Sequence, residues 1–409
     1  MNQKTLIGLA IAALIAIVVA VVLNQRSQPR SEGAAGSAWL APELREHVND
    51  VSRIVVTGAG NTVVATLERG ANGWTLAEKG GYAADTGKLR EFLLKLADAK
   101  LVEEKTANKD KYATLGVEDV ADQGAKGLQV ELDGLAQPLK LIVGNASTRG
   151  SGNFVRRVGE AQSWLASTTL SVPKSAAEWL RKDLVDVPAT RIESVAITHA
   201  DGKGFRVFKA NEGDANFTLA DIPKGREAGS EFTANGLAST LSGLNFEDVV
   251  PARDEAPGEK AVKTRYAAFD GLVVDAIAWE KDGKHYAQFK ASLDAAQADK
   301  GIAAAQAKAK ADFETMTAAA EAARTSKEAQ PEDAKDDPVK PSSIDDPAKD
   351  REDRLAAVNR EIAALNAHFD GWTFVLPAYK YANIDKPLED LLKPVEEKKP
   401  AAPAKKGGK

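Results

Sequence analysis

Two stretches of this sequence carry the same order of secondary-structure signals, and such a repeat restricts the fold more than any single motif. The first is GWTLAEKGGYAADTGKLREFLLKLADAKLVEE, residues 73–104. It predicts a short strand containing a Trp, a loop, an amphipathic helix and a second strand. Asp85 or Thr86 can cap the helix, whose buried stripe is marked by apolar residues at helical spacing: Leu89, Phe92, Leu93 and Leu96.

The second stretch is FTANGLASTLSGLNFEDVV, residues 232–250. Set beside the first without gaps, it places Leu237 on Leu89, Leu241 on Leu93 and Leu244 on Leu96. A hairpin pattern precedes each helix, as SRIVVTGAGNTVVATLERG in one case and RIESVAITHADGKGFRVFKA in the other. GWTL then corresponds to NFTL. The shared order of strand, helix and strand favours a duplicated unit over chance similarity of hydrophobic periodicity.

The later strands extend this comparison. GLVVDAIAWEKDGKHYAQFKAS parallels GLQVELDGLAQPLKLIVGN, and GWTFVLPAYKYANIDKPLEDLLKPV parallels QSWLASTTLSVPKSAAEWLRKDLVDV. The last pair predicts an aromatic strand followed by a helix that starts at a Pro. We therefore expect an α+β fold with two tandem copies of an antiparallel sheet covered by a helix. The predicted copies occupy residues 39–188 and 189–396.

An Ala-, Lys- and Glu-rich insertion interrupts the second copy at about residues 293–369. Two apolar series with steps of three and four predict two helices, Ile302, Ala305, Ala309, Phe313, Met316, Ala320 and Ala323, then Leu355, Val358, Ile362, Leu365 and Phe369. An acidic, Pro-bearing segment separates them. The pattern predicts an antiparallel coiled-coil hairpin with a disordered tip. The charged tail, residues 397–409, is expected to be disordered.

The N-terminus predicts a membrane anchor. Residues 6–23, LIGLAIAALIAIVVAVVL, carry no charge and would span roughly 27 Å as a helix, enough for a bilayer core. A secretory signal peptide is the alternative, but the run ends in VVLNQR without a small-residue cleavage site. Residues 1–38 therefore form a predicted single-pass anchor and flexible linker. A short tail before a large body favours an extracytoplasmic body, although the flanking charges are nearly balanced.

Composition excludes several classes of protein. The chain has no Cys, which excludes disulfides, thiol catalysis and Cys-ligated metals. Its formal net charge is −5 over 409 residues, and no stretch interleaves aromatic residues with Arg as nucleic-acid binding requires. None of the four His residues belongs to an HExxH motif or an i, i+4 pair. We expect no catalytic residue, cofactor or metal site.

Two motifs could carry chemistry. GNASTRGSGNFVRR is Gly-rich and includes Arg149, Arg156 and Arg157, which could hold an anionic ligand or contact a partner. The simpler interpretation is a hairpin with a solvated basic edge. Ser171 and Lys174 match the Ser-x-x-Lys spacing of penicillin-interacting enzymes, but the companion motifs are missing. Several aromatic residues fall in predicted strands and are expected to be core residues rather than sugar platforms, namely Trp74, Trp164, Phe217, Trp279 and Trp372.

Together, the N-terminal anchor, the RI-x-x-V opener, the GWTL strand, the L-x-x-x-L-x-x-L helix and the late W-x-x-x-x-P resemble the bacterial domain-of-unknown-function family 4340. The resemblance covers Trp39 to about Val395 apart from the insertion. It implies a role beside ABC transporters of the gliding-motility type, whose auxiliary subunit also has a membrane anchor and a large extracytoplasmic part. It supplies no catalytic residues.

The expected function is therefore a non-enzymatic accessory or scaffold protein of an envelope transport complex, held in the bacterial inner membrane by residues 6–23. Its expected partners are permease or auxiliary subunits, and nucleic acid is not among them. An extracytoplasmic module that binds an anionic or glycan ligand is the alternative. A hydrolase built on Ser171 and Lys174 is a third reading of the sequence.

Overall fold

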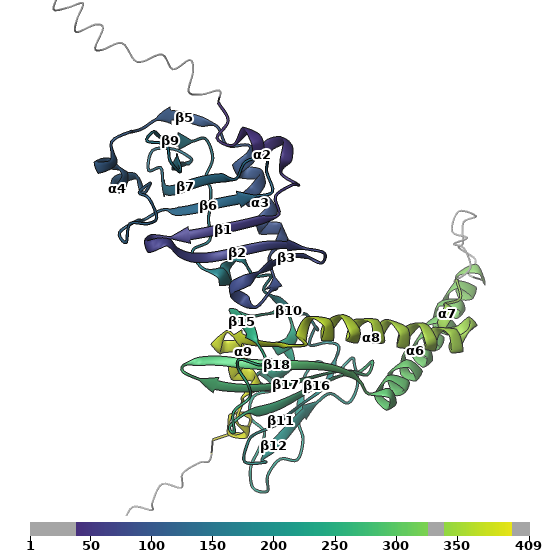
Figure 1. The fold of residues 1–409 in the computed structure, drawn as a ribbon. Helices are drawn as coiled ribbons and strands as arrows, with labels where there is room; N and C mark the ends of the chain where they lie inside the picture. Colours follow the sequence, from purple (N-terminus) through teal and green to yellow (C-terminus); the bar gives the residue numbers. More distant parts are fainter. Residues whose placement is uncertain (1–37, 326–338, 395–409) are drawn as a thin grey trace, which may run out of the picture. The chain divides into compact units, whose positions relative to one another are not determined.

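The computed structural model describes residues 38–325 and 339–394, and the chain divides into two compact units between Arg181 and Lys182. Each unit is an antiparallel sheet with helices packed against it (Figure 1). The expected α+β class is confirmed. The division lies seven residues before the expected end of the first copy at Pro188, because β10 (Asp183–Val185) pairs with β14 (Leu244–Asn245) of the second unit.

The first unit contains a nine-stranded sheet in the order β4-β3-β2-β1-β6-β7-β8-β9-β5. Its helices are α2 (Pro42–His47), α3 (Thr86–Ala97) and α4 (Tyr112–Leu115). Its strands are β1 (Arg53–Gly58), β2 (Thr62–Gly70), β3 (Gly73–Leu76), β4 (Tyr82–Ala83), β5 (Leu101–Glu104), β6 (Leu128–Asp133), β7 (Leu139–Ala146), β8 (Asn153–Arg157) and β9 (Ser163–Ala166).

Alternation of side chains along these strands creates the core. Ile54, Leu67 and Leu132 are paired across β1, β2 and β6, and all three are fully buried. Helix α3 covers this face with its predicted stripe, each residue of which is buried. Asp85 caps the helix, since its Oδ1 accepts the backbone N–H of Lys88 at 3.0 Å.

The short Pro-started helix predicted at the end of the first copy was wrong. Only one 3₁₀ turn forms, η5 (Ala176–Trp179), and the chain before it is irregular. The backbone here pairs with the end of β4 instead, since the N–H of Asp85 donates to Trp179 O at 2.7 Å and the N–H of Arg181 donates to Ala83 O at 3.2 Å. These bonds use backbone groups that a longer helix would need, and they hold the fully buried Trp179 against Phe92.

The second unit contains an eight-stranded sheet in the order β13-β12-β11-β16-β17-β18-β19-β15. Its helices are α5 (Glu231–Ala238), α6 (Ala295–Thr325), α7 (Ser342–Asp345), α8 (Pro347–Phe369) and α9 (Ala378–Ile384). Its strands are β11 (Ile192–Thr198), β12 (Gly204–Phe208), β13 (Thr218–Leu219), β15 (Asp248–Pro251), β16 (Val262–Ala268), β17 (Leu272–Lys281), β18 (Lys284–Leu293) and β19 (Trp372–Leu376).

The strands of the two sheets are connected in the same order. In each, a hairpin adds a third strand outward, a helix crosses to the opposite edge, and one strand forms there. The remaining strands then fill the sheet from the hairpin back to that edge. They are β6 to β9 in the first unit and β16 to β19 in the second, so β4 is the one strand of the larger sheet without a counterpart.

One strand of the second unit was missed by the sequence comparison. The strand that pairs with β11 is β16, in the place that β6 takes beside β1. GLVVDAIAWE forms β17 and is therefore the counterpart of β7, whereas the comparison had placed it on β6. The alternating pattern VKTRYAA in β16 is polar on its outer face, so it lacks the long apolar run that marks β17.

The two predicted helices of the insertion are present as α6 and α8, but the continuous coiled-coil seam was wrong. Met316, a predicted seam residue, is 57% exposed. Helix α8 packs against β18 through Phe369, whose ring centroid lies 5.5 Å from that of Phe289. The end of β18 extends past β19 and needs cover, so the apolar stripe of α8 is used on the sheet.

The predicted anchor at residues 6–23, the linker that follows it, residues 326–338 of the predicted tip and the tail at 397–409 lie outside the described residues. The rest of the predicted disordered tip is described, and there the prediction was wrong, because Ser342–Asp345 form α7. In the part of the chain that the structure describes, no helix has both the length and the apolar character needed to cross a bilayer.

Candidate functional site

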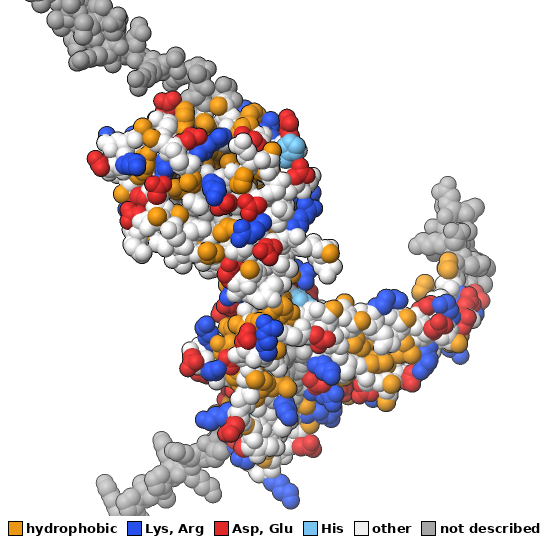
Figure 2. All heavy atoms as spheres, viewed as in Figure 1, with side chains coloured by type: hydrophobic (Ala, Val, Ile, Leu, Met, Phe, Trp, Pro, Cys, Tyr) orange, Lys and Arg blue, Asp and Glu red, His pale blue; other side chains and the backbone are white. Residues whose placement is uncertain are grey.

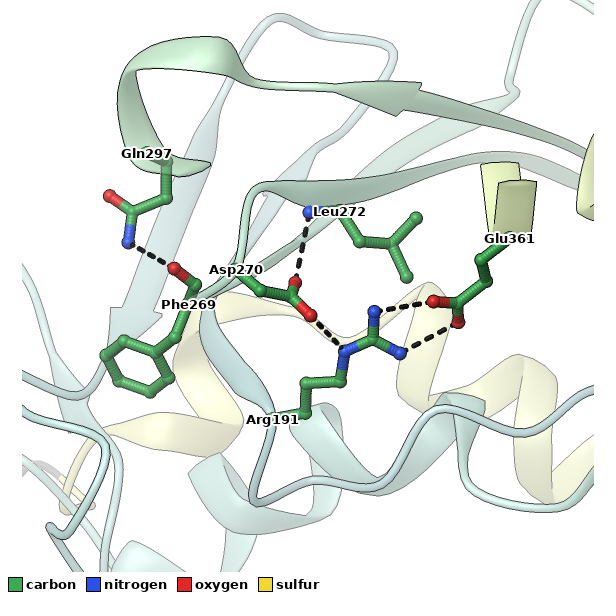
Figure 3. Close-up of polar contacts among 6 residues, drawn as sticks. All are labelled: Arg191, Phe269, Asp270, Leu272, Gln297 and Glu361. Atoms are coloured by element: carbon green, nitrogen blue, oxygen red, sulfur yellow. Dashed lines mark hydrogen bonds and ion pairs between the residues drawn. The ribbon is translucent and has the colours of Figure 1, made fainter. Parts of the chain in front are cut away.

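Arg191 joins the inserted helix α8 to the sheet of the second unit (Figure 3). It stands immediately before β11 and donates from Nε to Asp270 Oδ2 at 2.7 Å, in the turn between β16 and β17. Its two terminal nitrogens donate to the two carboxylate oxygens of Glu361 on α8, at 2.8 and 2.7 Å. One guanidinium thus links three segments that are far apart in the sequence.

The geometry makes this a strong ionic contact. The fork of Arg191 matches the carboxylate of Glu361 bidentately, which fixes both distance and angle. The three side chains are 25 to 39% exposed, so water screens the charges only in part. The hydrogen bond to Glu361, more than the contacts to Asp270, raises the pKa of Arg191 above its usual range, and the guanidinium stays charged.

Helix α6 is held at its start by close backbone approach to the same turn. A Cβ at Gly271 would lie 2.5 Å from the Cβ of Ala298, and one at Gly301 would lie 2.1 Å from Phe269 O. Gln297 donates from Nε2 to Phe269 O at 3.4 Å (Figure 3). Glycine at these two positions therefore permits the helix to touch the β16–β17 turn.

The end of α8 completes the edge of β18. Asn366 accepts the backbone N–H of Ala291 at 2.8 Å and donates to its carbonyl at 2.9 Å. The side-chain amide thereby supplies both bonds that a neighbouring strand would have made. The last turns of α8 are consequently part of the second unit, although they belong to the insertion in sequence.

We call the contacts of Arg191, Gly271, Gly301 and Asn366 the base of the insertion. Beyond the base, α6 and α8 contact each other over a short region. Gln306 donates to Pro347 O at 2.8 Å and to Asp350 at 3.0 Å, and Arg351 donates to Asp299 at 2.7 Å. The part of α6 after Gln306 has no buried residue among those described. We call residues 308–345 the outer arm. The contacts described above hold the start of this arm on the sheet, and both carboxylates of the site are engaged by Arg191.

The structure separates the three Arg residues that the sequence suggested as an anion site. Arg156 is 3% exposed and donates to Val117 O, Glu160 O and the carboxylate of Asp119. Arg157 follows it in β8, points to the opposite face and donates to Leu40 O at 2.6 Å. Arg149 is exposed in the turn between β7 and β8. They do not converge on one ligand.

Replacing Arg156 by Ala should destabilise the first unit by about 2 kcal/mol, because Asp119 and two carbonyls lose their donor in a largely buried position. Arg149→Ala should leave stability within about 0.5 kcal/mol, since its side chain is exposed. Urea unfolding followed by the fluorescence of the first unit measures both. Equal effects of the two variants would contradict this structural role for Arg156.

The other sequence candidates form no reactive site. Ser171 and Lys174 are exposed and precede the first helical turn, so Ser171 does not start a helix as the Ser-x-x-Lys chemistry requires. His199 contacts Asp385 at 3.3 Å and Lys386 O at 3.2 Å. Among residues 38–325 and 339–394, no group of His, Asp and Glu side chains is arranged to hold a metal ion.

The predicted aromatic core residues differ in burial. Phe217 and Trp279 are buried as expected, whereas Trp74, Trp164 and Trp372 are half-buried. The contact between Arg191 and Glu361 was not predicted, because the two residues are 170 positions apart in the sequence. The repeated Arg-Ile strand opener at Arg53 and Arg191 was the available signal.

One comparison with known proteins finds a match. A family model described as "Domain of unknown function (DUF4340)" matches residues 74–263, just under half of the chain. The matched range begins in β3 of the first unit and ends in β16 of the second. No curated protein and no solved structure matches the chain.

Proposed function

Because this chain belongs to the DUF4340 family through residues 74–263, we propose that it is a non-enzymatic accessory protein of an ABC-type envelope transport complex. Residues 6–23 would anchor it in the bacterial inner membrane, with the bulk of the chain on the extracytoplasmic side. The outer arm would contact a permease or auxiliary subunit. The transporter association follows from the family resemblance given by the sequence motifs.

The observation that supports this proposal best is the contrast between the base and the outer arm of the insertion. The base is fixed by a bidentate Arg, an amide that replaces a strand and two close glycine contacts. The outer arm carries exposed apolar side chains, with Met316 57% and Val339 88% exposed, and Figure 2 shows hydrophobic side chains on the surface of the inserted helices. A helix that is fixed at its base and exposes apolar side chains beyond it is suited to binding a partner protein.

We also infer that the two units arose by duplication, which would give the protein two related surfaces. The shared order of strands supports this inference, and so does a repeated ion pair. Arg53 contacts Asp133 at 3.1 Å in the first unit, where Arg191 contacts Asp270 in the second. A glycine with positive φ follows each Asp, at +102° for Gly134 and +88° for Gly271. The insertion would then have recruited a pair that the ancestral unit already had.

A variant without the outer arm tests the accessory role. Gln306 and Pro347 are in hydrogen-bond contact, so a short Gly-rich linker can replace residues 308–345 without moving the base. From detergent-solubilised membranes, the tagged full chain should recover a permease or auxiliary subunit and the armless variant should not. Deletion of residues 397–409 is the matched control and should retain the partner.

Two results would contradict the proposal. Recovery of the full chain alone under gentle conditions would remove the accessory role. Equal recovery of the partner by the armless variant would assign the contact to another surface. The ligand-binding alternative is supported by one specific feature, a cavity in the first unit that Arg157 lines without Arg149 or Arg156.

A further inference from the structure

A cavity of about 280 Å³ opens on the face of the first sheet that α3 covers, near the edge formed by β9 and β5. Val155 and Arg157 on β8, Trp164 on β9 and Leu101 on β5 line it, together with Trp39 and Glu160. Val155 and Trp164 are cross-strand partners and so project on the same side. The volume lies just below the range of drug-sized sites, which suits one small ring.

The cavity combines a donor, an acceptor and an aromatic face. Arg157 uses one nitrogen on Leu40 O, and within the described residues no other hydrogen bond to its guanidinium is present. The carboxylate of Glu160 likewise has no polar partner in that part of the chain. The Cζ atom of Arg45 lies 3.7 Å from the ring centroid of Trp39, and the Nζ atom of Lys100 lies 4.6 Å from it. Among the described residues, no Lys or Arg covers the ring of Trp164 in this way.

The second unit indicates the shape of an occupant. There the corresponding strands β18 and β19 carry Phe289 and Phe374, and the ring of Phe369 from α8 packs 5.5 Å from that of Phe289. A flat ring thus fills this position in one unit, whereas the other has an open cavity. This comparison depends on the inferred duplication, while the cavity and its polar groups do not.

We propose that the cavity is a binding site for a single neutral sugar ring in the pyranose form. The C–H face of the ring stacks on Trp164, as amphipathic rings do on indole. One hydroxyl donates to the Glu160 carboxylate, and another accepts from the free nitrogens of Arg157. One ring of this size binds in the millimolar range, because few atoms are in contact. The site is separate from the outer arm and does not depend on the accessory role.

The test uses the full chain labelled with 5-fluorotryptophan, in a detergent without a sugar head group. Methyl β-glucoside is the probe, and Trp164→Phe assigns the Trp164 fluorine resonance. That resonance should shift and saturate, and Trp372 of the second unit should not respond. Glu160→Gln should weaken binding about tenfold, because it removes a charged acceptor. Glu43→Gln, an exposed carboxylate on α2 outside the cavity, is the matched control and should bind normally.

Four outcomes overturn the proposal. One is the absence of a saturable Trp164 shift with the glucoside. Another is equal binding of cyclohexanol, which would show a merely apolar hole. The third is binding of glucuronate in place of the glucoside, which would show an acidic ligand held by Arg157. An unchanged affinity of the Glu160→Gln variant would remove the assigned acceptor.

Discussion

The Gly271→Ala variant is expected to lose more than about 3 kcal/mol of local stability at the base of the insertion. Two costs combine. The φ angle of Gly271 is +88°, a conformation that disfavours any side chain. The added Cβ would also lie 2.5 Å from the Cβ of Ala298 and 2.7 Å from Asp294 O, and neither can move without shifting the start of α6.

Hydrogen exchange of the full chain, read by mass spectrometry, measures this loss segment by segment. Protection should fall in β17, the end of β18 and the first turns of α6, while the first unit is unchanged. Gly283→Ala is the matched control. Gly283 also has positive φ, +71°, at the other end of β17, but nothing lies within 4 Å of its Cβ position. Its substitution should cost only about 1 kcal/mol. Equal costs would refute the close contact at Gly271.

The Arg191→Ala variant is expected to release α8 from the sheet at a cost of about 2–3 kcal/mol. Removing the guanidinium breaks three hydrogen bonds and leaves the carboxylates of Asp270 and Glu361 without their shared cation. Partial exposure of the three side chains keeps the cost below that of a fully buried pair. Exchange should rise in α8 and at the end of β18, where Asn366 meets Ala291.

Arg53→Ala in the first unit provides the comparison. Arg53 contacts Asp133 at 3.1 Å and Glu68 at 3.7 Å, but it is 44% exposed and no inserted helix uses it. Its loss should cost less than about 1 kcal/mol. Glu361→Gln should fall between the two variants, because it removes the charge and keeps one acceptor. A cost of Arg191→Ala no larger than that of Arg53→Ala would show that the bidentate contact does not hold α8.

Local patterns predicted most of the elements correctly. The cap at Asp85 and the stripe ending at Leu96 describe α3 because helix start signals and 3.6-residue spacing act within one element. The element at Trp179 failed for the opposite reason. Its backbone groups bond to Ala83 and Asp85, about a hundred positions earlier, and that competition is absent from the local sequence.

The candidate sites were less predictable than the elements. Arg156 and Arg157 are adjacent in sequence, but neighbouring residues of a strand project to opposite faces. Arg156 therefore forms an ion pair with Asp119, whereas Arg157 lines the cavity. Arg191 was not predicted as a contact residue, because its partner Glu361 follows far later in the sequence, within the insertion. Arg156 and Arg157 were predicted to act together because they are adjacent in sequence, but the pleat of the strand separates them. Arg191 and Glu361 are far apart in sequence, and only tertiary packing brings them into contact.

The sequence by itself determined the α+β class, the hairpins and the longer helices, because each depends on periodicity and turn chemistry within a few residues. Only the tertiary structure decided how the insertion is used. The apolar stripe of α8 could have paired with α6 or with a sheet. The unpaired end of β18 and the guanidinium of Arg191 settle that choice in favour of the sheet, because exposed strand edges and lone charges are costly when partners are within reach.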